Sequence, residues 1–300
     1  MPSGRETAVP PTMSPVSTPS SIKCSVTPTR FAPSPTGPLH LGHAYSAMLA
    51  HDMALAEGGE FLLRIEDIDQ SRARAEWESQ IYDDLHWLGI DWPVPVMRQS
   101  DRMDTYATAL DQLWNAELLY PCTCTRRDIA AAASAPQEGA PMGPDGIIYP
   151  GTCRNHDRHG PRPADAVLRL DVTRAAREVR YIDQSEITVQ ADTFINDIGD
   201  VVLARRDMGT SYHLSVVVDD AAQGITDVVR GADLAEATPI HVLLQHLLGL
   251  PTPTYHHHRL FRDEAGKRLA KRDDARAIAK YRAEGATADD IRRLVGLPLP

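Results

Sequence analysis

The chain has 300 residues, a formal net charge of −10, and a composition that is 42% apolar and 24% charged. These values are typical of a globular protein with one large or two modest domains. The negative charge argues against nonspecific nucleic-acid binding through bulk positive charge, and the lack of an apolar run of roughly 20 residues argues against a membrane span.

Residues 1–28 are rich in proline, serine and threonine and lack hydrophobic periodicity. Such a segment cannot bury enough surface to offset its ordering entropy, so we expect a disordered tail. It lacks the charged region followed by an apolar core that marks a secretory signal. The four cysteines do not suggest a disulfide framework, which favours a reduced, cytoplasmic setting.

The first structured unit, 29–118, begins as strand, helix and strand. The predicted elements are a strand over Thr29–Ala32, a helix over 44–56, a buried strand over Glu60–Ile65, and helices over 72–88 and 102–118. A β–α–β order begins an open parallel sheet. We therefore interpret 29–118 as the first half of an α/β domain.

The turn after the first strand, Pro33–His43, brings polar groups to the predicted start of the helix. Backbone N–H groups at a helix N-terminus point outward and favour anions, so phosphate is the natural ligand. His40 and His43 add two side-chain donors, and Gly42 allows a flat group to approach the backbone closely. Because ligands of open α/β sheets lie outside the carboxyl ends of the strands, we place a site here and at Glu66.

Residues 119–190 differ in composition and are interpreted as an insertion outside the main sheet. They hold an Ala-rich helix over 128–135, strands over Val167–Leu170 and Glu186–Val189, and three of the four cysteines. Cys122, Cys124 and Cys153 supply three thiolates, while zinc usually has four ligands in a tetrahedron. His156 is the standard chemical choice for the fourth. A closed site of this kind would be structural.

The segment 191–248 is interpreted as the second half of the α/β domain. Asp200–Arg205 and Leu214–Asp220 are predicted to be strands that return to the sheet. Asp219 and Asp220 would then be a weaker candidate site at a strand end. Mostly loop and helix are predicted over Ile225–Asp233, Ile240–Leu248 and 261–300.

The region 249–300 contains a histidine run, a basic loop and a short helical segment. Consecutive side chains on a strand alternate faces, so His256–His258 cannot easily converge on one metal ion, and we assign it none. The segment Gly266–Arg272 is strongly basic. A mobile loop with several cations can hold pyrophosphate oxygens and stabilise charge that develops on a phosphate.

Two separated motifs resemble those of a known protein class. Arg30–His43, which ends in His40-Leu41-Gly42-His43, resembles the first signature of class I aminoacyl-tRNA synthetases in its glutamyl/glutaminyl form. Gly266–Arg272 resembles the Lys-Met-Ser-Lys-Ser loop of the class, with Ala270 in place of the serine. The resemblance implies a Rossmann-like open parallel sheet. It also implies ATP-binding residues, the first three of which would be catalytic: His40, His43, Lys271, Gly42 and Arg268.

The same resemblance implies a glutamate site. Glu66 would accept from the substrate ammonium, and Arg230 would face the side-chain carboxylate. The other residues that it places around glutamate are Arg30, Phe31, Ala32, Pro33, Ser34 and Tyr212. The implied reaction is activation of L-glutamate by ATP, with Mg²⁺ sharing the phosphate charge.

Two further features resemble the glutamyl-Q tRNA(Asp) synthetase family. In that family a tyrosine completes the thiolate set, and the spacing of Tyr149 and Cys153 favours Tyr149 over His156 as fourth ligand of one structural Zn²⁺ per chain. The chain also ends soon after Arg272, without the helical anticodon-binding region of full glutamyl-tRNA synthetases. The family transfers glutamate to the queuosine base in the anticodon of tRNA(Asp), so that tRNA is the implied partner. We expect a monomer.

Two rival interpretations stay open. One is a truncated glutamyl-tRNA synthetase that charges tRNA(Glu). The other is a non-catalytic synthetase-like protein that binds nucleotide or RNA. The presence of both motif histidines together with Glu66, Arg230 and Lys271 argues against the second.

Overall fold

The computed structural model describes residues 27–133, 140–261 and 276–299. The expected tail 1–28 therefore lies almost wholly outside the described residues, as does the basic loop with Arg268 and Lys271. Among the described residues, no helix combines the length and apolar character that a membrane span requires.

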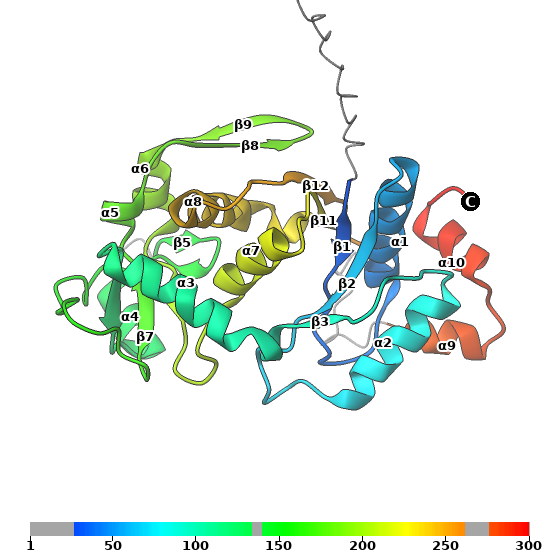
Figure 1. Ribbon diagram of the computed structural model, residues 1–300, viewed down its shortest axis with the longest axis horizontal. Coiled ribbons are helices and arrows are strands. Elements are labelled where there is room, and N and C mark those ends of the chain that lie inside the picture. Colours follow the sequence, from blue (N-terminus) through cyan, green and yellow to red (C-terminus); the bar gives the residue numbers. More distant parts are fainter. Residues whose placement is uncertain (1–26, 134–139, 262–275, 300) are drawn as a thin grey trace, which may run out of the picture.

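A seven-stranded sheet organises the fold and confirms the predicted parallel α/β architecture. In spatial order its strands are β3 Met97–Arg98, β2 Phe61–Ile65, β1 Thr29–Phe31, β11 Asp227–Gly231, β12 Thr254–His258, β8 Val179–Asp183 and β9 Ser185–Val189. Neighbours from β3 to β8 pair in parallel, and β9 pairs antiparallel with β8. From the central pair β1 and β11, the chain continues toward opposite edges of the sheet (Figure 1). Such a switch point is where open α/β sheets bind ligands.

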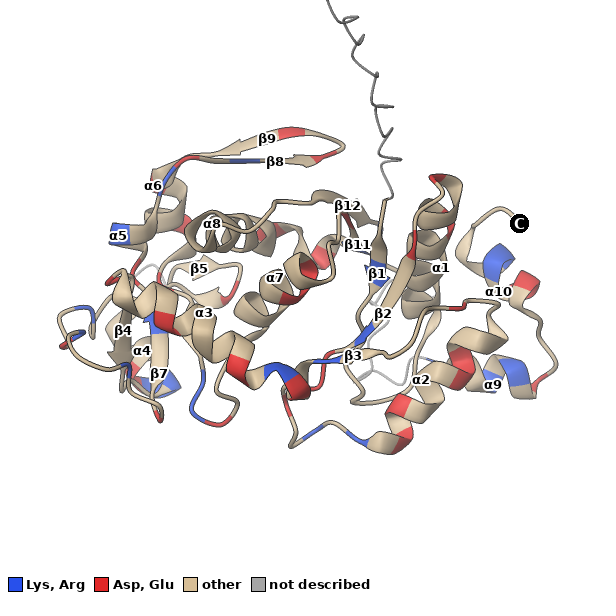
Figure 2. Ribbon diagram, viewed as in Figure 1, with Lys and Arg blue, Asp and Glu red and all other residues tan. Residues whose placement is uncertain are grey.

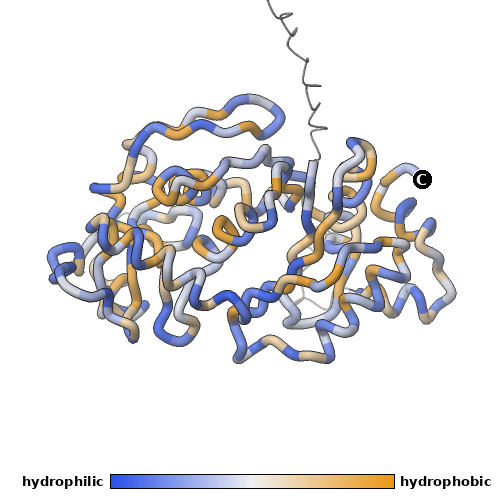
Figure 3. Tube along the Cα trace, in the orientation of Figure 1, coloured by the Kyte–Doolittle hydropathy of each residue, from blue (hydrophilic) through white to orange (hydrophobic). Residues whose placement is uncertain are grey.

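Helices cover both faces of this sheet. On one face lie α1 Leu41–Ala56, α2 Ala75–Trp87, α9 Ile278–Ala283 and α10 Ala288–Val295, and on the other lie α3 Met103–Asn115, α7 Tyr212–Ala222 and α8 Thr238–Leu248. Val228 packs in one hydrophobic core and Val229 in the other, because consecutive strand residues point to opposite faces. Figure 3 shows hydrophobic residues along these inner strands and helices.

The predicted strand over Leu214–Asp220 is wrong, because this segment is part of helix α7. Ser211 caps the helix by accepting from the backbone N–H of Leu214. All residues from His213 to Asp220 are buried, so the segment lacks the exposed polar face by which a surface helix is recognised in a sequence. A short apolar run of this kind cannot be told from a buried strand by its periodicity.

The central strand β11 lies in Ile225–Asp233, for which mostly loop and helix are predicted. That prediction is therefore also wrong. Val228 and Val229 are fully or almost fully buried between β1 and β12, and two neighbouring strands satisfy the backbone groups of this short segment. The tertiary pairing, and not the local sequence, makes it a strand.

A three-stranded antiparallel sheet lies at the end of the molecule that is remote from α1 (Figure 1). It contains β4 Leu119–Cys122, β7 Val167–Leu170 and β10 Val202–Ala204, and near it lie α4 Arg126–Ala133 and the hairpin of β5 Met142–Gly143 and β6 Gly146–Ile147. Asp200–Arg205 therefore contributes a strand to this small sheet and not to the main sheet, which corrects the prediction. The short elements α5 Val172–Ala175 and α6 Ala191–Thr193 connect the two sheets.

Candidate functional site

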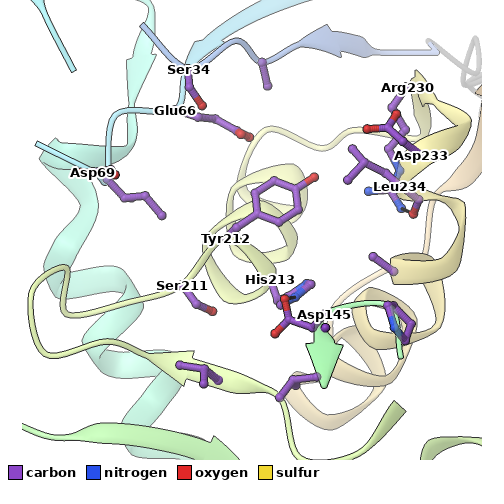
Figure 4. A pocket seen from close by; sticks show the side chains of 18 of the residues that line it. Ser34, Glu66, Asp69, Asp145, Ser211, Tyr212, His213, Arg230, Asp233 and Leu234 are labelled. Carbon is purple, nitrogen blue, oxygen red and sulfur yellow. Dashed lines mark hydrogen bonds and ion pairs between the residues drawn. The ribbon is translucent and has the colours of Figure 1, made fainter. Parts of the chain in front are cut away.

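One cavity of about 1380 Å³ lies at the carboxyl ends of β1, β2 and β11. Its wall includes the loop after β1, the first turn of α7 and the end of β11, and it extends to the small sheet and the β5–β6 hairpin. Figure 4 shows Glu66 and Ser34 on one side, Arg230 on the other and Tyr212 between them. All eight residues predicted around glutamate line this cavity: Arg30, Phe31, Ala32, Pro33, Ser34, Glu66, Tyr212 and Arg230.

The three predicted nucleotide residues of the first motif lie together at the start of α1. The backbone N–H of Gly42 donates to Nδ1 of His40, and the backbone N–H of His40 donates to Nδ1 of His43, each at 3.1 Å. Because Nδ1 of each ring accepts, the proton of each neutral ring is on Nε2, which suits both rings to donate to an anion. A Cβ atom at Gly42 would lie 3.1 Å from the His40 ring, so this close approach favours glycine.

Behind the loop, buried charged side chains form a network. Asp220 accepts from Nε of Arg30 at 3.0 Å and from Nη1 of Arg64 at 2.7 Å. The fully buried Arg64 also donates to Glu66 at 3.2 Å. Burial raises the pKa of Glu66, and the positive charges of Arg64 and Arg30 offset this in part. A ligand ammonium beside Glu66 would favour its carboxylate form.

Asp219 and Asp220 lie on α7 and not at a strand end, which corrects their prediction as a candidate site. Asp219 is fully buried and accepts hydrogen bonds from Arg102, Gln99 and Tyr106 at 2.6, 3.0 and 2.7 Å. Figure 2 shows acidic positions of α7 next to basic positions of β1 and β2. Neither aspartate lines the cavity, so they act by holding the arginines in place.

Arg230 differs from Arg30 because neutral groups hold it. Its Nε donates to Nε2 of His257 at 3.1 Å, its Nη1 to Nδ1 of His241 at 3.0 Å, and its Nη2 to Oγ1 of Thr238 at 2.8 Å. Arg230 is 5% exposed, and among the described residues no carboxylate lies within ion-pair distance of it. Its charge is therefore available to an anionic ligand.

The neutral state of His241 makes a testable contribution to stability. Burial, followed by the charge of Arg230, lowers the pKa of His241 well below 6.5. The contribution of neutral His241 to the free energy of unfolding is complete above the pKa of this histidine in the unfolded chain, about 6.5. Below that pH the free energy of unfolding falls by up to about 1.4 kcal/mol per pH unit. We expect His241→Gln, which cannot titrate, to lose less stability than the wild type between pH 7.5 and 5.5. Urea unfolding at the two pH values measures this, and equal losses would contradict it.

A second candidate site lies at the small sheet. The Sγ atoms of Cys122, Cys124 and Cys153 all lie within 4.8 Å of one another. The phenol oxygen of Tyr149 is 3.5 Å from Sγ of Cys122 and 3.3 Å from Sγ of Cys124. It accepts from the backbone N–H of Cys153 at 3.0 Å. Three thiols and one phenol oxygen thus converge, which is a donor set that fits zinc.

The surroundings of this cluster favour Tyr149 over His156 as the fourth ligand. Nδ1 of the exposed His156 lies 3.1 Å from the carbonyl oxygen of Pro121. Arg169 approaches the cluster from β7, donating from Nε to Sγ of Cys122 at 3.3 Å and lying 3.9 Å from the Tyr149 ring centre. A cation at this position offsets thiolate charge. The four side chains would hold zinc in a closed, structural site.

The three consecutive histidines of β12 contact three different partners. His256 pairs with Asp227 at 2.7 Å, His257 with Asp183 at 2.7 Å, and His258 with Ser46 at 2.5 Å. Alternation along a strand turns His257 to the face opposite that of its two neighbours, and the partners of all three rings differ. The roles of His257, His241 and Asp220 are absent from the sequence prediction, because their signal is a buried partner from another element.

Both sides of the segment 262–275 are attached to the start of α1. Before it, the Phe261 ring lies 4.9 Å from the Tyr45 ring. After it, Ala277 forms an antiparallel bridge with His40. The predicted ATP-binding cations of the second motif lie between these two attachments, outside the described residues.

Comparison with known proteins identifies close relatives. Residues 26–297 match the family described as tRNA synthetases class I (E and Q), catalytic domain. A protein of Rhodobacter capsulatus named glutamyl-Q tRNA(Asp) synthetase is 64% identical over 278 residues, which cover 90% of this chain and 99% of that protein. A protein of Deinococcus radiodurans with the same name is 44% identical, over 85% of this chain and 83% of that protein.

Solved structures support the same fold. A glutamate tRNA ligase from Elizabethkingia meningosepticum in complex with its amino acid superposes with a TM-score of 0.71 at 28% identity over 90% of this chain. A glutamate-tRNA synthetase from Elizabethkingia anophelis gives 0.72, also at 28% identity and 90% coverage. The chain spans about three-fifths of the length of these two proteins, 60% and 61%.

Proposed function

The chain belongs to the glutamyl-Q tRNA(Asp) synthetase family of class I (E and Q) tRNA synthetases, and we propose that it attaches glutamate to the queuosine base of tRNA(Asp). It is a ligase of the aminoacyl-tRNA synthetase type, a class that uses ATP with Mg²⁺. In this proposal it activates L-glutamate without needing tRNA and then transfers it to the anticodon.

The observation that carries the proposal is the placement of Arg230 and Glu66 in one cavity at the switch point of the sheet. Arg230 offers a buried positive charge with neutral partners, and Glu66 offers an acceptor for an ammonium group. Free glutamate carries a side-chain carboxylate and an ammonium group, so its binding needs both a positive charge and such an acceptor. Tyr212 and Ser34 line the space between them, where the rest of the substrate would lie (Figure 4).

The first step needs positioning and charge stabilisation, without an enzyme nucleophile. The α-carboxylate oxygen of glutamate attacks the α-phosphorus of ATP, the bond to pyrophosphate breaks, and glutamyl-adenylate forms. His40 and His43 would donate from Nε2 to the phosphates, with the adenine near Gly42. Lys271 and Arg268 would stabilise the charge of the departing pyrophosphate, which Mg²⁺ shares.

The second step transfers glutamate to RNA. A hydroxyl of the queuosine cyclopentene ring attacks the adenylate carbonyl, and AMP leaves. The cavity continues from Tyr212 to the small sheet, which provides space for an extruded base. Arg126, Arg205 and Arg206 line that part and can meet the phosphates of an anticodon loop.

Labelled glutamate and ATP, supplied with tRNA(Asp) with and without queuosine and with tRNA(Glu) in parallel, test the acceptor. We expect label on the queuosine-bearing tRNA(Asp) alone. Label on tRNA(Glu) would instead make the protein a minimal glutamyl-tRNA synthetase. Absence of glutamate-dependent ATP–pyrophosphate exchange would favour a binding protein without catalysis.

The metal site makes a separate prediction. We expect about one zinc per chain in protein purified without chelators, and we expect Cys153→Ser to lose most of it, because a tetrahedral site loses one of its thiolates. Tyr149→Phe should weaken zinc binding at least about tenfold in chelator competition, while His156→Ala should not. Elemental analysis and melting temperature provide the readouts. An effect of His156→Ala that exceeds that of Tyr149→Phe would reverse the choice of fourth ligand.

A further inference from the structure

Arg30 and Arg230 are equally buried but differ in what compensates their charge. Each is 5% exposed. Asp220 forms an ion pair with Arg30 at 3.0 Å. Arg230 instead donates to three uncharged side chains, here called the neutral cage: Thr238, His241 and His257.

We infer that the neutral cage sets the selectivity of the site for a negatively charged side chain over its uncharged amide, that is, for glutamate over glutamine. This inference rests on the proposed function, in which Arg230 binds the side-chain carboxylate. The cage satisfies N–H groups of the guanidinium without cancelling its charge, so a bound carboxylate becomes its anionic partner. A carboxylate in the cage would cancel that charge and remove the advantage of glutamate.

The hydrogen-bond directions show that His241 is held as a neutral acceptor. A guanidinium can only donate, so Nδ1 of His241, 3.0 Å from Nη1 of Arg230, must accept. The ring proton is then on Nε2, which lies 3.1 Å from Nδ1 of His213 and donates to it. This fixes the proton of a neutral His213 on Nε2, which faces Asp145 of the β5–β6 hairpin at 3.6 Å.

His257 repeats the arrangement on the other side of the guanidinium. Its Nε2 accepts from Nε of Arg230 at 3.1 Å, and its Nδ1 donates to Asp183 at 2.7 Å. Asp183 thus ends one hydrogen-bonded chain, and Asp145 lies 3.6 Å beyond His213 at the end of the other, so imidazole rings separate both carboxylates from Arg230. The atoms that contact the Arg230 side chain are therefore neutral, although carboxylates lie beyond them.

A pair of variants at Thr238 tests the inference with little change of shape. Thr238→Asp places a carboxylate near the position of Oγ1, which is 2.8 Å from Nη2 of Arg230, and Thr238→Asn places an uncharged amide there. Thr238 is fully buried beside the Arg230 guanidinium, whose positive charge would compensate that of the new carboxylate, so we expect the aspartate variant to fold.

The readout is kcat/KM for glutamate and for glutamine in tRNA-independent ATP–pyrophosphate exchange. We expect Thr238→Asp to lower the ratio of glutamate to glutamine at least about 30-fold, as buried charge pairs couple strongly. Thr238→Asn should change the ratio less than about threefold, and KM for ATP should stay near the wild-type value in both. If these residues act in folding alone, the variants would lower kcat/KM for glutamate and for glutamine equally, and the ratio would not change.

A second pair repeats the test from another side of the guanidinium. His241→Glu should lower the ratio as Thr238→Asp does, and His241→Gln, a neutral acceptor, should preserve it. His246→Glu on the exposed face of the same helix is the matched control and should behave as wild type. Melting curves show whether each variant is folded.

The outcomes separate the inference from the proposed function. If the wild type activates glutamate but both acidic variants keep its selectivity, or the neutral variants lose it equally, the neutral cage does not set selectivity. If the folded wild type activates no glutamate, the proposed function fails and this inference fails with it. A collapse of the ratio confined to the acidic variants supports both.

Discussion

Arg230→Gln is expected to lower kcat/KM for glutamate in ATP–pyrophosphate exchange by about 10²- to 10³-fold, because loss of one partner of a buried charge pair costs about 3–4 kcal/mol. The loss should appear in KM for glutamate, since Arg230 would bind the substrate in both ground and transition states. KM for ATP should change little, because the proposed phosphate donors lie on another element, at the start of α1.

Arg230→Lys should recover a small part of this loss. A lysine ammonium keeps the charge, but it cannot reproduce the planar fork that donates to the neutral cage. Arg206→Gln is the matched control, since this exposed arginine lines the same cavity and pairs at 3.4 Å with an exposed Asp165. We expect it to cost less than about threefold in activation. Activity of Arg230→Gln within tenfold of wild type would mean that the side-chain carboxylate binds elsewhere.

Asp220→Asn is expected to destabilise the fold by about 3–5 kcal/mol, because it leaves two buried guanidinium groups without their shared anion. Asp220 is 5% exposed, and its partners Arg30 and Arg64 are 5% and 0% exposed. Burial favours the neutral form of this carboxyl, but Arg30 and Arg64 outweigh that effect and lower its pKa. Its stabilising charge is therefore present throughout the neutral range and is lost in acid.

Urea unfolding at neutral pH measures the effect of Asp220→Asn. Asp207→Asn is the control, because Asp207 pairs at 3.3 Å with Arg205 on the surface, where such pairs contribute about 0–1 kcal/mol. A loss for Asp220→Asn as small as that of the control would mean that the arginines find other partners. The activity of the folded fraction should also fall, since Arg30 lines the cavity of the proposed glutamate site and Arg64 donates to Glu66, which also lines it.

The parallel sheet could be predicted because local sequence patterns mark each element of its first β–α–β unit. Thr29–Ala32, the turn with three prolines and two histidines, and Glu60–Ile65 each carry patterns that depend on neighbouring residues. Helix α7 and strand β11 could not be predicted in the same way. Both contain short valine runs that are buried on all sides, so hydrophobic periodicity cannot distinguish a helix from a strand. The position of β11 in the sheet also depends on its pairing with β1, almost 200 residues away.

The candidate site could likewise be predicted only in part. The residues that would touch substrates fall in motifs and were predicted together, and the cavity brings the described ones together. The contacts that orient them were not predicted, although the sequence marks Asp220 as a weaker candidate: Asp220 meets Arg30 across 190 positions, and His257 meets Arg230 across 27. Such partners are set by packing between elements and leave no local spacing to detect.

The bridge between His40 and Ala277 ties the polypeptide that follows the second motif to the start of the first. Ile278 strengthens this joint, since its backbone N–H donates to the carbonyl of Leu39 at 2.9 Å and its side chain is fully buried. Farther on, Arg292 clamps Asp52 of α1 at 2.6 Å. The last two helices therefore hold α1 at two places, and its start carries the proposed phosphate donors. We expect a truncation that removes these helices to lower both stability and ATP binding.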